Sequence, residues 1–179
     1  MTLPSLIPFE EITHLFSEFQ HTAFRLETRR SYASDRQGAR FQAFMQGVEP
    51  QPEPDHPWNV NVRAMTAQGA RFSRIRIVDE PPTDGQRFLM ASAAANTAGE
   101  DVRVLSRSLA GQLELPGYDF WLFDSSTLVL MHIDESDTTI GVEVSSDPAQ
   151  VLEASRVRDA AWPLAVPAAV VWPRVRSSV

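Results

Sequence analysis

The sequence contains no cysteine and no lysine among its 179 residues. Without cysteine, the chain excludes disulfides, thiolate catalysis, zinc–thiolate sites and iron–sulfur clusters. Without lysine, it excludes Schiff-base chemistry, the Walker-A phosphate loop and any His-x-Lys pair. No apolar run approaches the ~20 residues of a membrane span, and the first residues lack the basic and apolar regions of a signal peptide. We therefore expect a cytoplasmic protein without a membrane segment.

The basic residues are 16 arginines, and the net charge is −7. A GC-rich genome accounts for arginine in place of lysine. Non-specific nucleic-acid affinity comes mainly from neutralising phosphates, so an acidic chain is a poor binder of this kind. Direct nucleic-acid binding is therefore disfavoured, although a local stripe of arginines would still suit a phosphate or an acidic partner.

The length and composition favour a single domain over residues 1–179, because 43% hydrophobic and 22% charged residues are ordinary for a globular chain. Residues 48–57 carry four prolines in ten positions and show no periodicity, which predicts a loop. We interpret this loop as a surface excursion and not as a linker, since a helical N-terminal part of about 1–47 is small for a core of its own. The main α/β body then covers 58–179.

Helical periodicity recurs along the chain. Residues 8–21 place apolar side chains three and four positions apart, which predicts an amphipathic helix. A helix is also predicted at 148–162, where Asp147 supplies a cap and Pro148 suits the first helical position. The other predicted helices cover 34–47, 58–69 and 84–99.

Six segments have the pattern of strands, at 23–32, 71–82, 100–107, 118–124, 127–134 and 138–145. The last three are joined by two or three residues, which favours an antiparallel meander because parallel neighbours need a long crossover. In the middle of segment 118–124, apolar residues occur at odd-numbered and at even-numbered positions. This pattern is expected of a central strand that is buried on both faces. Three prolines make 163–179 irregular or edge-like. The fold class is thus α+β or α/β, with one mixed sheet of about five or six strands and helices over its faces.

His132 and Asp134 are the first candidates for chemistry. They lie two apart at the end of a strand, so both side chains point to the same face, where a carboxylate could orient the imidazole. The favoured interpretation is a hairpin whose polar residues mark the reversal of the chain. The alternative is a phosphodiesterase-like or degenerate phospholipase-D-like enzyme in which His132 acts as base or nucleophile and Arg74 or Arg103 holds the phosphate.

Arginines form the second candidate site. Alternation puts Arg74 and Arg76 on one face of a strand, and Arg103 and Arg107 follow on the next. Guanidinium forks bind carboxylate or phosphate bidentately. The competing interpretation is a solvated or ion-paired face of the sheet.

Other chemistries lack a motif. The four histidines are scattered without a His-Glu-x-x-His pattern, so we expect no metal. No Gly-x-Ser-x-Gly elbow surrounds Ser125 and Ser126, and no glycine-rich phosphate loop occurs, so we expect no nucleotide cofactor and indeed no cofactor at all.

Several stretches together resemble an uncharacterised family of small actinobacterial proteins encoded beside helix-turn-helix regulators of the xenobiotic-response-element class. The stretches are "FRLETRRSY", "RIRIVDEPP", "NTAGEDVRVLSR", "LPGYDFWLFDS", "LMHID" and "RDAAW". The resemblance implies a helix-turn-helix regulator as partner and transfers no catalytic residue.

These observations favour a non-catalytic accessory or interaction protein of a regulatory locus, which binds a partner protein or a small ligand. An enzyme that uses His132 is the alternative, and nucleic-acid binding through an arginine face is the second alternative.

Overall fold

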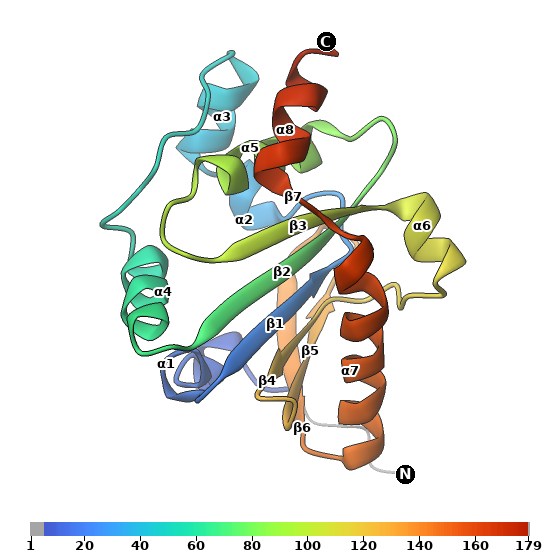
Figure 1. Cartoon of the computed structure of the whole chain (residues 1–179). Coiled ribbons are helices and arrows are strands. Elements are labelled where there is room, and N and C mark those ends of the chain that lie inside the picture. The colour runs from blue at the N-terminus through green and yellow to red at the C-terminus, as the bar shows by residue number, and fades with distance from the viewer. Residues whose placement is uncertain (1–5, 179) are drawn as a thin grey trace.

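The computed structural model describes residues 6–178, and a mixed sheet organises this part of the chain (Figure 1). Within these residues the sheet has seven strands in the order β6-β5-β4-β1-β2-β3-β7. Strands β1, β2 and β3 are parallel, while β4, β5, β6 and β7 pair antiparallel with their neighbours. The strands are β1 Thr22–Glu27, β2 Arg71–Val78, β3 Asp101–Ser106, β4 Phe120–Phe123, β5 Thr127–Ile133, β6 Thr139–Ser145 and β7 Val166–Pro167.

Helices cover both faces of the sheet, which confirms the predicted α+β class with one mixed sheet and a meander at β4-β5-β6. The first part of the chain holds η1 Phe9–Ile12, α1 Leu15–Glu18, α2 Ala33–Arg36 and α3 Ala39–Met45. The remaining helices are α4 Pro57–Ala67, α5 Asp84–Ala95, α6 Arg107–Gln112, α7 Pro148–Ala161, η2 Trp162–Leu164 and α8 Ala168–Arg176.

One face of the sheet, here called the apolar face, is filled with hydrophobic side chains. Phe24, Ile75 and Leu122 lie on it, and all three are almost completely buried. Helices α6 and α7 and the turn η2 cover them, and Val151, Ala154 and Val157 of α7 face the strands. Continuous apolar burial of this kind supplies the main driving force for folding.

The other face, here called the cavity face, holds two apolar clusters separated along the sheet. The first packs η1, α1 and α4 against β4, β5 and β6, with Phe16 in contact with Trp121 and Phe123. The second packs α5 and α8 against β2 and β3 around Met90 and Trp172. Charged side chains occupy the sheet between the two clusters.

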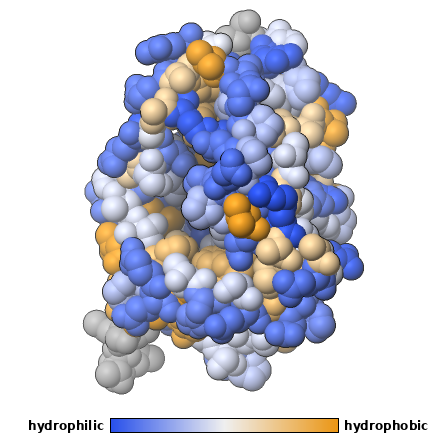
Figure 2. Space-filling view, turned by 90° about the vertical axis from the view of Figure 1, so that its left-hand side faces the viewer, coloured by the Kyte–Doolittle hydropathy of each residue, from blue (hydrophilic) through white to orange (hydrophobic). Residues whose placement is uncertain are grey.

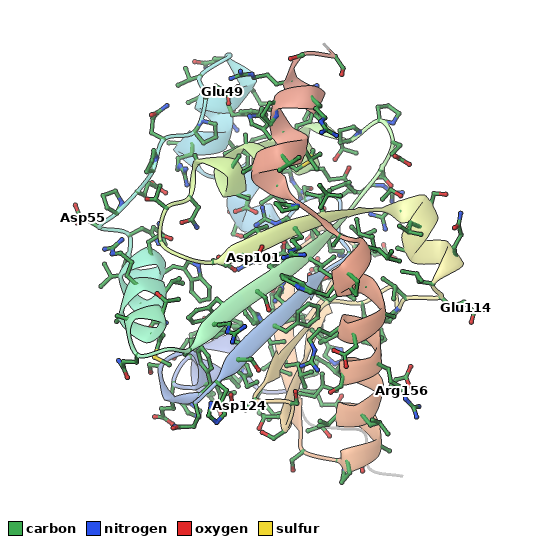
Figure 3. The ribbon with its side chains drawn as sticks, viewed as in Figure 1. Glu49, Asp55, Asp101, Glu114, Asp124 and Arg156 are labelled. Atoms are coloured by element: carbon green, nitrogen blue, oxygen red, sulfur yellow. The ribbon has the colours of Figure 1, made fainter. Side chains whose placement is uncertain are left out.

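The start of β1 is fixed by the turn between β4 and β5. The Asp124 carboxylate accepts the backbone N–H groups of Gln20, His21 and Thr22 at 2.7, 2.7 and 2.9 Å, and Figure 3 shows Asp124 beside the start of β1. Partial burial raises the pKa of Asp124, but these hydrogen bonds outweigh it and leave the pKa below its ordinary value. The serine pair after Asp124 is therefore part of a structural turn.

Three local expectations were wrong in detail. The single helix expected at 8–21 is two short turns, η1 and α1, and the helix expected at 34–47 breaks at Gly38 into α2 and α3. The C-terminal segment, expected to be irregular or edge-like, does supply the edge strand β7, but it continues as the helix α8 in spite of Pro173. Packing against α5 and burial of Trp172 offset the hydrogen bond that this proline removes.

Candidate ligand-binding site

A cavity of about 1090 Å³ opens over the middle of the cavity face. Strands β1, β2 and β4 form its floor, and α2, α3, α4, α5 and the proline-rich segment 48–56 form its walls. Figure 2 faces the side of the molecule that carries α4 and this segment, and the surface there is hollowed and mostly hydrophilic around the hollow. A cavity of this volume can hold a small organic molecule.

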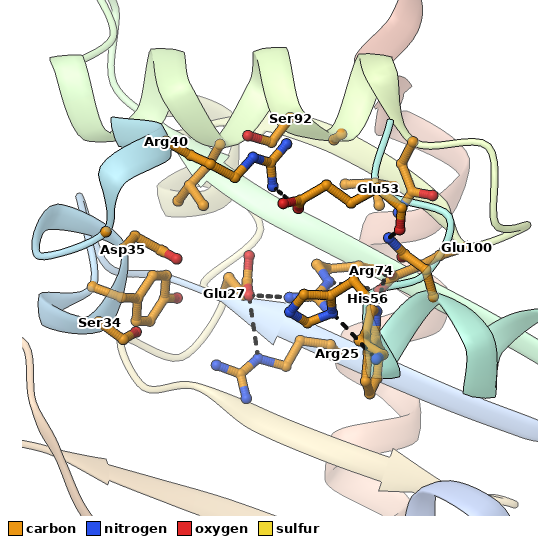
Figure 4. Close-up of a pocket in the computed structure, with 18 of the residues that line it drawn as sticks. Arg25, Glu27, Ser34, Asp35, Arg40, Glu53, His56, Arg74, Ser92 and Glu100 are labelled. Carbon is orange, nitrogen blue, oxygen red and sulfur yellow. Dashed lines mark hydrogen bonds and ion pairs between the residues drawn. The ribbon is translucent and has the colours of Figure 1, made fainter. Parts of the chain in front are cut away.

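Four charged residues of the floor come together through the register of β1 and β2. Arg25 lies opposite Arg74 and Glu27 lies opposite Arg76, and alternation turns all four side chains to the same face. The Glu27 carboxylate accepts hydrogen bonds from the Arg76 Nε at 2.5 Å and from a guanidinium nitrogen of Arg74. The Arg25 Nε lies 3.6 Å from the same carboxylate, close enough for an ion pair but not for a hydrogen bond. Three guanidinium groups therefore converge on one carboxylate, and Figure 4 shows those of Arg25 and Arg74 beside Glu27.

Glu27 is ionised in this setting. Burial by itself raises the pKa of a carboxyl group, but Arg74, Arg76 and Arg25 together outweigh burial and lower the pKa of Glu27 to about 2. The same attraction keeps Arg74 charged, because Glu100 and Glu27 raise its pKa against the opposing effect of burial. Glu27 therefore acts as a hydrogen-bond acceptor throughout the neutral range.

Asp119 anchors one end of the floor. Its carboxylate accepts the Arg25 guanidinium at 3.0 Å, the backbone N–H of Thr28 at 2.8 Å, the Thr28 hydroxyl at 2.8 Å and the Tyr32 hydroxyl at 2.6 Å. Burial, followed by the charges of Glu27 and Asp119, raises the pKa of Tyr32, so the phenol keeps its proton and donates it to Asp119. Asp119 is 2% exposed, and its oxygens are fully used by the chain itself.

Glu100 anchors the other end. It accepts the Arg74 Nε at 2.8 Å and the Trp58 indole N–H at 3.2 Å. The Arg74 guanidinium also lies 5.4 Å from the Trp121 ring centre, and the Arg25 guanidinium lies at the same distance from that ring. The arginines are thus held by carboxylates at both ends and by an aromatic ring beneath them.

Two buried polar atoms of the cavity wall have no hydrogen-bond partner among the described residues, the Arg25 Nε and the Ser92 hydroxyl. Asp35 on α2 faces Glu27 across the cavity (Figure 4). Burial raises the pKa of Asp35, with Arg76 acting in the opposite direction. Unsatisfied polar groups in a cavity indicate positions that a bound molecule can use.

The rim is built by the proline-rich segment. Arg40 of α3 pairs with Glu53 of the segment and donates to the Gln51 carbonyl. At the far end, the His56 Nδ1 accepts the Trp58 N–H at 3.2 Å and so caps α4, which leaves the proton of the neutral ring on Nε2. The loop expected at 48–57 is therefore a wall of the cavity.

Of the four arginines predicted as candidates for ligand binding, only two lie in the same site. Arg74 and Arg76 lie together in the cavity floor. Arg103 points to the apolar face, where it pairs with Asp101 at 3.1 Å and stacks on Trp162 at 4.1 Å.

Arg107 begins α6 and contributes to a separate cluster around Asp79. Its Nε lies 2.5 Å from the Asp79 carboxylate, and it donates to the Thr28 carbonyl at 3.0 Å. Partial burial raises the pKa of Asp79, but its contacts with Arg107 and Arg30 outweigh this effect. The pKa of Asp79 therefore lies below its ordinary value. This cluster joins the ends of β1, β2 and β3.

His132 and Asp134 lie apart from the cavity. His132 belongs to β5 but faces the opposite side from its neighbour Met131, which lines the cavity, and its Nε2 lies 3.7 Å from Glu143. Asp134 accepts the backbone N–H groups of Ser136 and Thr138 at 2.9 and 3.0 Å in the β5–β6 turn, and these contacts, the hydroxyl of Ser136 above all, lower its pKa. Asp134 is thus held by the turn, whereas the His132 Nε2 is buried and has no hydrogen-bond partner among the described residues.

Sequence reasoning missed most of the floor. Arg25 and Glu27 alternate with buried apolar residues in "FRLE", the same pattern that singled out Arg74 and Arg76, so this signal was available. Asp119, Glu100 and Trp58 gave no comparable signal, because they reach the cavity from a strand end, a loop and a helix.

Two further properties concern the described residues as a group. Within residues 6–178, histidines and carboxylates form no group of three that could hold a metal ion. None of the helices in that range combines the length and apolar character that crossing a bilayer requires.

Comparison with known proteins identifies the family but no activity. Residues 10–172 match the family described as a domain of unknown function, DUF6879, and the chain therefore belongs to that family. No curated protein matches. Among solved structures, TrmBL2, an archaeal chromatin protein described as having a novel mode of DNA binding, shares 8% identity at a TM-score of 0.45. The alignment covers 88% of this chain and 49% of TrmBL2, so the chain spans about half the length of that protein, and a likeness of this size carries no information about function.

Proposed function

We propose that this member of the DUF6879 family binds a small molecule in the cavity over the sheet and performs no chemistry on it. The observation that carries the proposal is the group of six charged side chains in the floor, set between two apolar clusters. These side chains are Arg25, Glu27, Arg74, Arg76, Glu100 and Asp119.

Stability alone does not explain such a group. Desolvating buried ions costs several kcal/mol each, and replacing a buried ion pair by apolar residues of similar volume is often neutral or stabilising by ~1–4 kcal/mol. The apolar face of the same sheet is packed with hydrophobic side chains, so this fold can accommodate apolar residues in place of buried ion pairs. Charged groups retained at the floor of a cavity are typical of a site that recognises polar groups of a ligand.

The ionisable groups of the cavity favour binding over catalysis. Glu27 is held by three arginines, and Asp119 is saturated by its four hydrogen bonds. The Nδ1 of His56 accepts the Trp58 N–H, so this nitrogen is already used by the chain. His132 faces away from the cavity and takes no part in the proposed binding.

A regulatory partner completes the proposal. The resemblance noted in the sequence supports a helix-turn-helix regulator that senses whether the cavity is filled. Co-expression of the chain with a helix-turn-helix regulator of the xenobiotic-response-element class tests this part, and failure to co-purify at micromolar concentrations counts against it.

Binding itself can be tested with the four tryptophans of the chain as reporters. Trp58 and Trp121 line the cavity, whereas Trp162 packs on the apolar face and Trp172 packs in the cluster between α5 and α8. We expect cavity ligands from a library of polar fragments at millimolar concentration to shift the indole N–H signals of Trp58 and Trp121 in ¹H–¹⁵N spectra and leave the other two unchanged. A library in which no fragment moves either cavity signal would contradict the proposal.

A further inference from the structure

The arginines of the cavity floor have many more hydrogen-bond donors than the chain uses. A guanidinium group has five N–H donors. Arg74 donates to Glu27 and Glu100, Arg76 donates to Glu27 and the Leu89 carbonyl, and Arg25 donates to Asp119. Most of the N–H groups therefore have no acceptor within the described chain, and the Arg25 Nε is buried without one. These free donors suit a ligand that supplies acceptor atoms.

The formal charges of the floor, in contrast, are already balanced. Arg25, Arg74 and Arg76 face an equal number of carboxylates, which are those of Glu27, Glu100 and Asp119. Glu27 takes the position between the three guanidinium groups that a carboxylate or phosphate ligand would otherwise occupy.

The walls add no positive charge for an anion. Arg40 is paired with Glu53 at the rim, and the Asp35 side chain faces the floor from α2 and has no hydrogen-bond partner within residues 6–178. An anionic ligand would therefore meet the charge of Glu27 and the carboxyl oxygens of Asp35, and like charges at short range in a partly buried site are strongly unfavourable.

We infer that Glu27 serves as a built-in anion, and that the cavity takes an uncharged, hydroxyl-rich small molecule of the sugar, polyol or nucleoside kind. Hydroxyl groups both accept and donate. They can accept from the spare guanidinium N–H groups and from the Ser92 hydroxyl, and donate to Glu27 and Asp35. This inference rests on the proposed ligand-binding function and specifies the class of ligand.

The test compares neutral compounds with their own phosphate esters. The probes are a panel of monosaccharides, disaccharides, inositols and nucleosides, each paired with its monophosphate, and the readout is the indole signal of Trp58 and Trp121 during titration. For wild-type protein we expect neutral members of the panel to bind, with the matching phosphate at least about tenfold weaker, because like-charge repulsion in a partly buried site exceeds about 1.4 kcal/mol. Binding of the neutral compound should not change between low and high salt.

Two variants reverse this preference. Glu27→Gln keeps the shape of the side chain but removes the built-in anion, so inorganic phosphate, which we expect not to bind the wild type at millimolar concentration, should now bind. Asp35→Asn breaks no hydrogen bond of the described chain and should shift the preference toward phosphate by a smaller factor. It keeps the test valid if Glu27→Gln fails to fold. Asp101→Asn, in an arginine–carboxylate pair outside the cavity, is the matched control and should leave the preference unchanged.

The outcomes separate the two claims. Phosphate esters that bind wild-type protein more tightly than their neutral parents would overturn the inference and leave the ligand-binding function standing, as would cavity binding confined to cationic or apolar fragments. Glu27→Gln and Asp35→Asn variants that are both folded and yet gain no phosphate binding would also overturn it. If no compound of any class shifts the cavity indoles at 10 mM or so, which corresponds to a binding free energy weaker than about 3 kcal/mol, both claims fail.

Discussion

The two faces of the sheet are covered by helices in the same way but are chemically opposite. The apolar face forms one continuous hydrophobic cluster under α6 and α7, with Phe24, Leu26 and Leu122 at its centre. The cavity face divides its apolar residues between two clusters and places ion pairs between them. One face thus supplies the cohesion of the fold, which leaves the middle of the other available for a site whose charges cost stability.

The largest expected effect comes from removing Asp119, on which the cavity face depends. Asp119→Ala leaves the buried Arg25 without its carboxylate and the Thr28 and Tyr32 groups without their acceptor. Breaking a buried ion pair in this way costs about 3–5 kcal/mol. Urea denaturation should therefore show a large loss in the free energy of unfolding.

The matched control is Asp101→Ala, which removes an exposed carboxylate from its pair with Arg103, two residues further along β3. Exposed pairs contribute less than ~1 kcal/mol, so this variant should unfold close to the wild type. Equal effects of the two substitutions would mean that the cavity face is not a special environment.

The next largest effect is a pH dependence of the folding stability, which arises from the cavity face. The pKa of Glu27 is lowered from 4.5 to about 2 in the folded chain, so its carboxylate stabilises the fold above pH 4.5, and this contribution is lost as the pH falls from 4.5 toward 2. The shift corresponds to about 3 kcal/mol.

Denaturation curves measured at pH 6, 4 and 2.5 can isolate this contribution. Glu27→Gln should lower stability at pH 6 and flatten its dependence on acid, because the glutamine does not titrate. A Leu122→Ala variant on the apolar face should lose a similar amount of stability, ~2–5 kcal/mol, at every pH. If Glu27→Gln and wild type lost stability in parallel on acidification, the role assigned to Glu27 would be wrong.

The smallest effect is expected at His132. Because its side chain faces away from the cavity, His132→Ala should change the affinity of cavity ligands by less than about twofold, in keeping with the additivity of distant sites. Titration followed by the Trp58 and Trp121 signals measures this change. A tenfold loss would connect the β5–β6 hairpin to the site and revive an enzyme that uses this imidazole.

The sequence anticipated the fold better than the site. Turn residues and short joints between 118 and 145 predicted the meander, and the apolar residues of 118–124 predicted the fully buried strand β4, which lies beside the central strand β1. Asp147 and Pro148 predicted the start of α7, and its cap is present. These signals are local, since they depend on the backbone preferences of a few adjacent residues.

Long-range pairing decided the rest. Pro173 indicated an irregular end, but contact with α5 stabilises α8. Arg74 and Arg103 carried the same pattern in the sequence, yet the strands turn them to opposite faces. The nature of the cavity depends on partners about 25 to 95 residues apart, because Glu100 and Asp119 reach their arginines only after the sheet is assembled.

The sequence by itself determined that the chain forms strands in which arginines alternate with apolar residues. Successive side chains of a strand point to opposite faces, so this alternation separates a charged face from an apolar one. Only the tertiary structure decided that Glu27 lies among three of those arginines and balances their charge. That arrangement depends on the register between strands distant in the chain, which no local preference encodes.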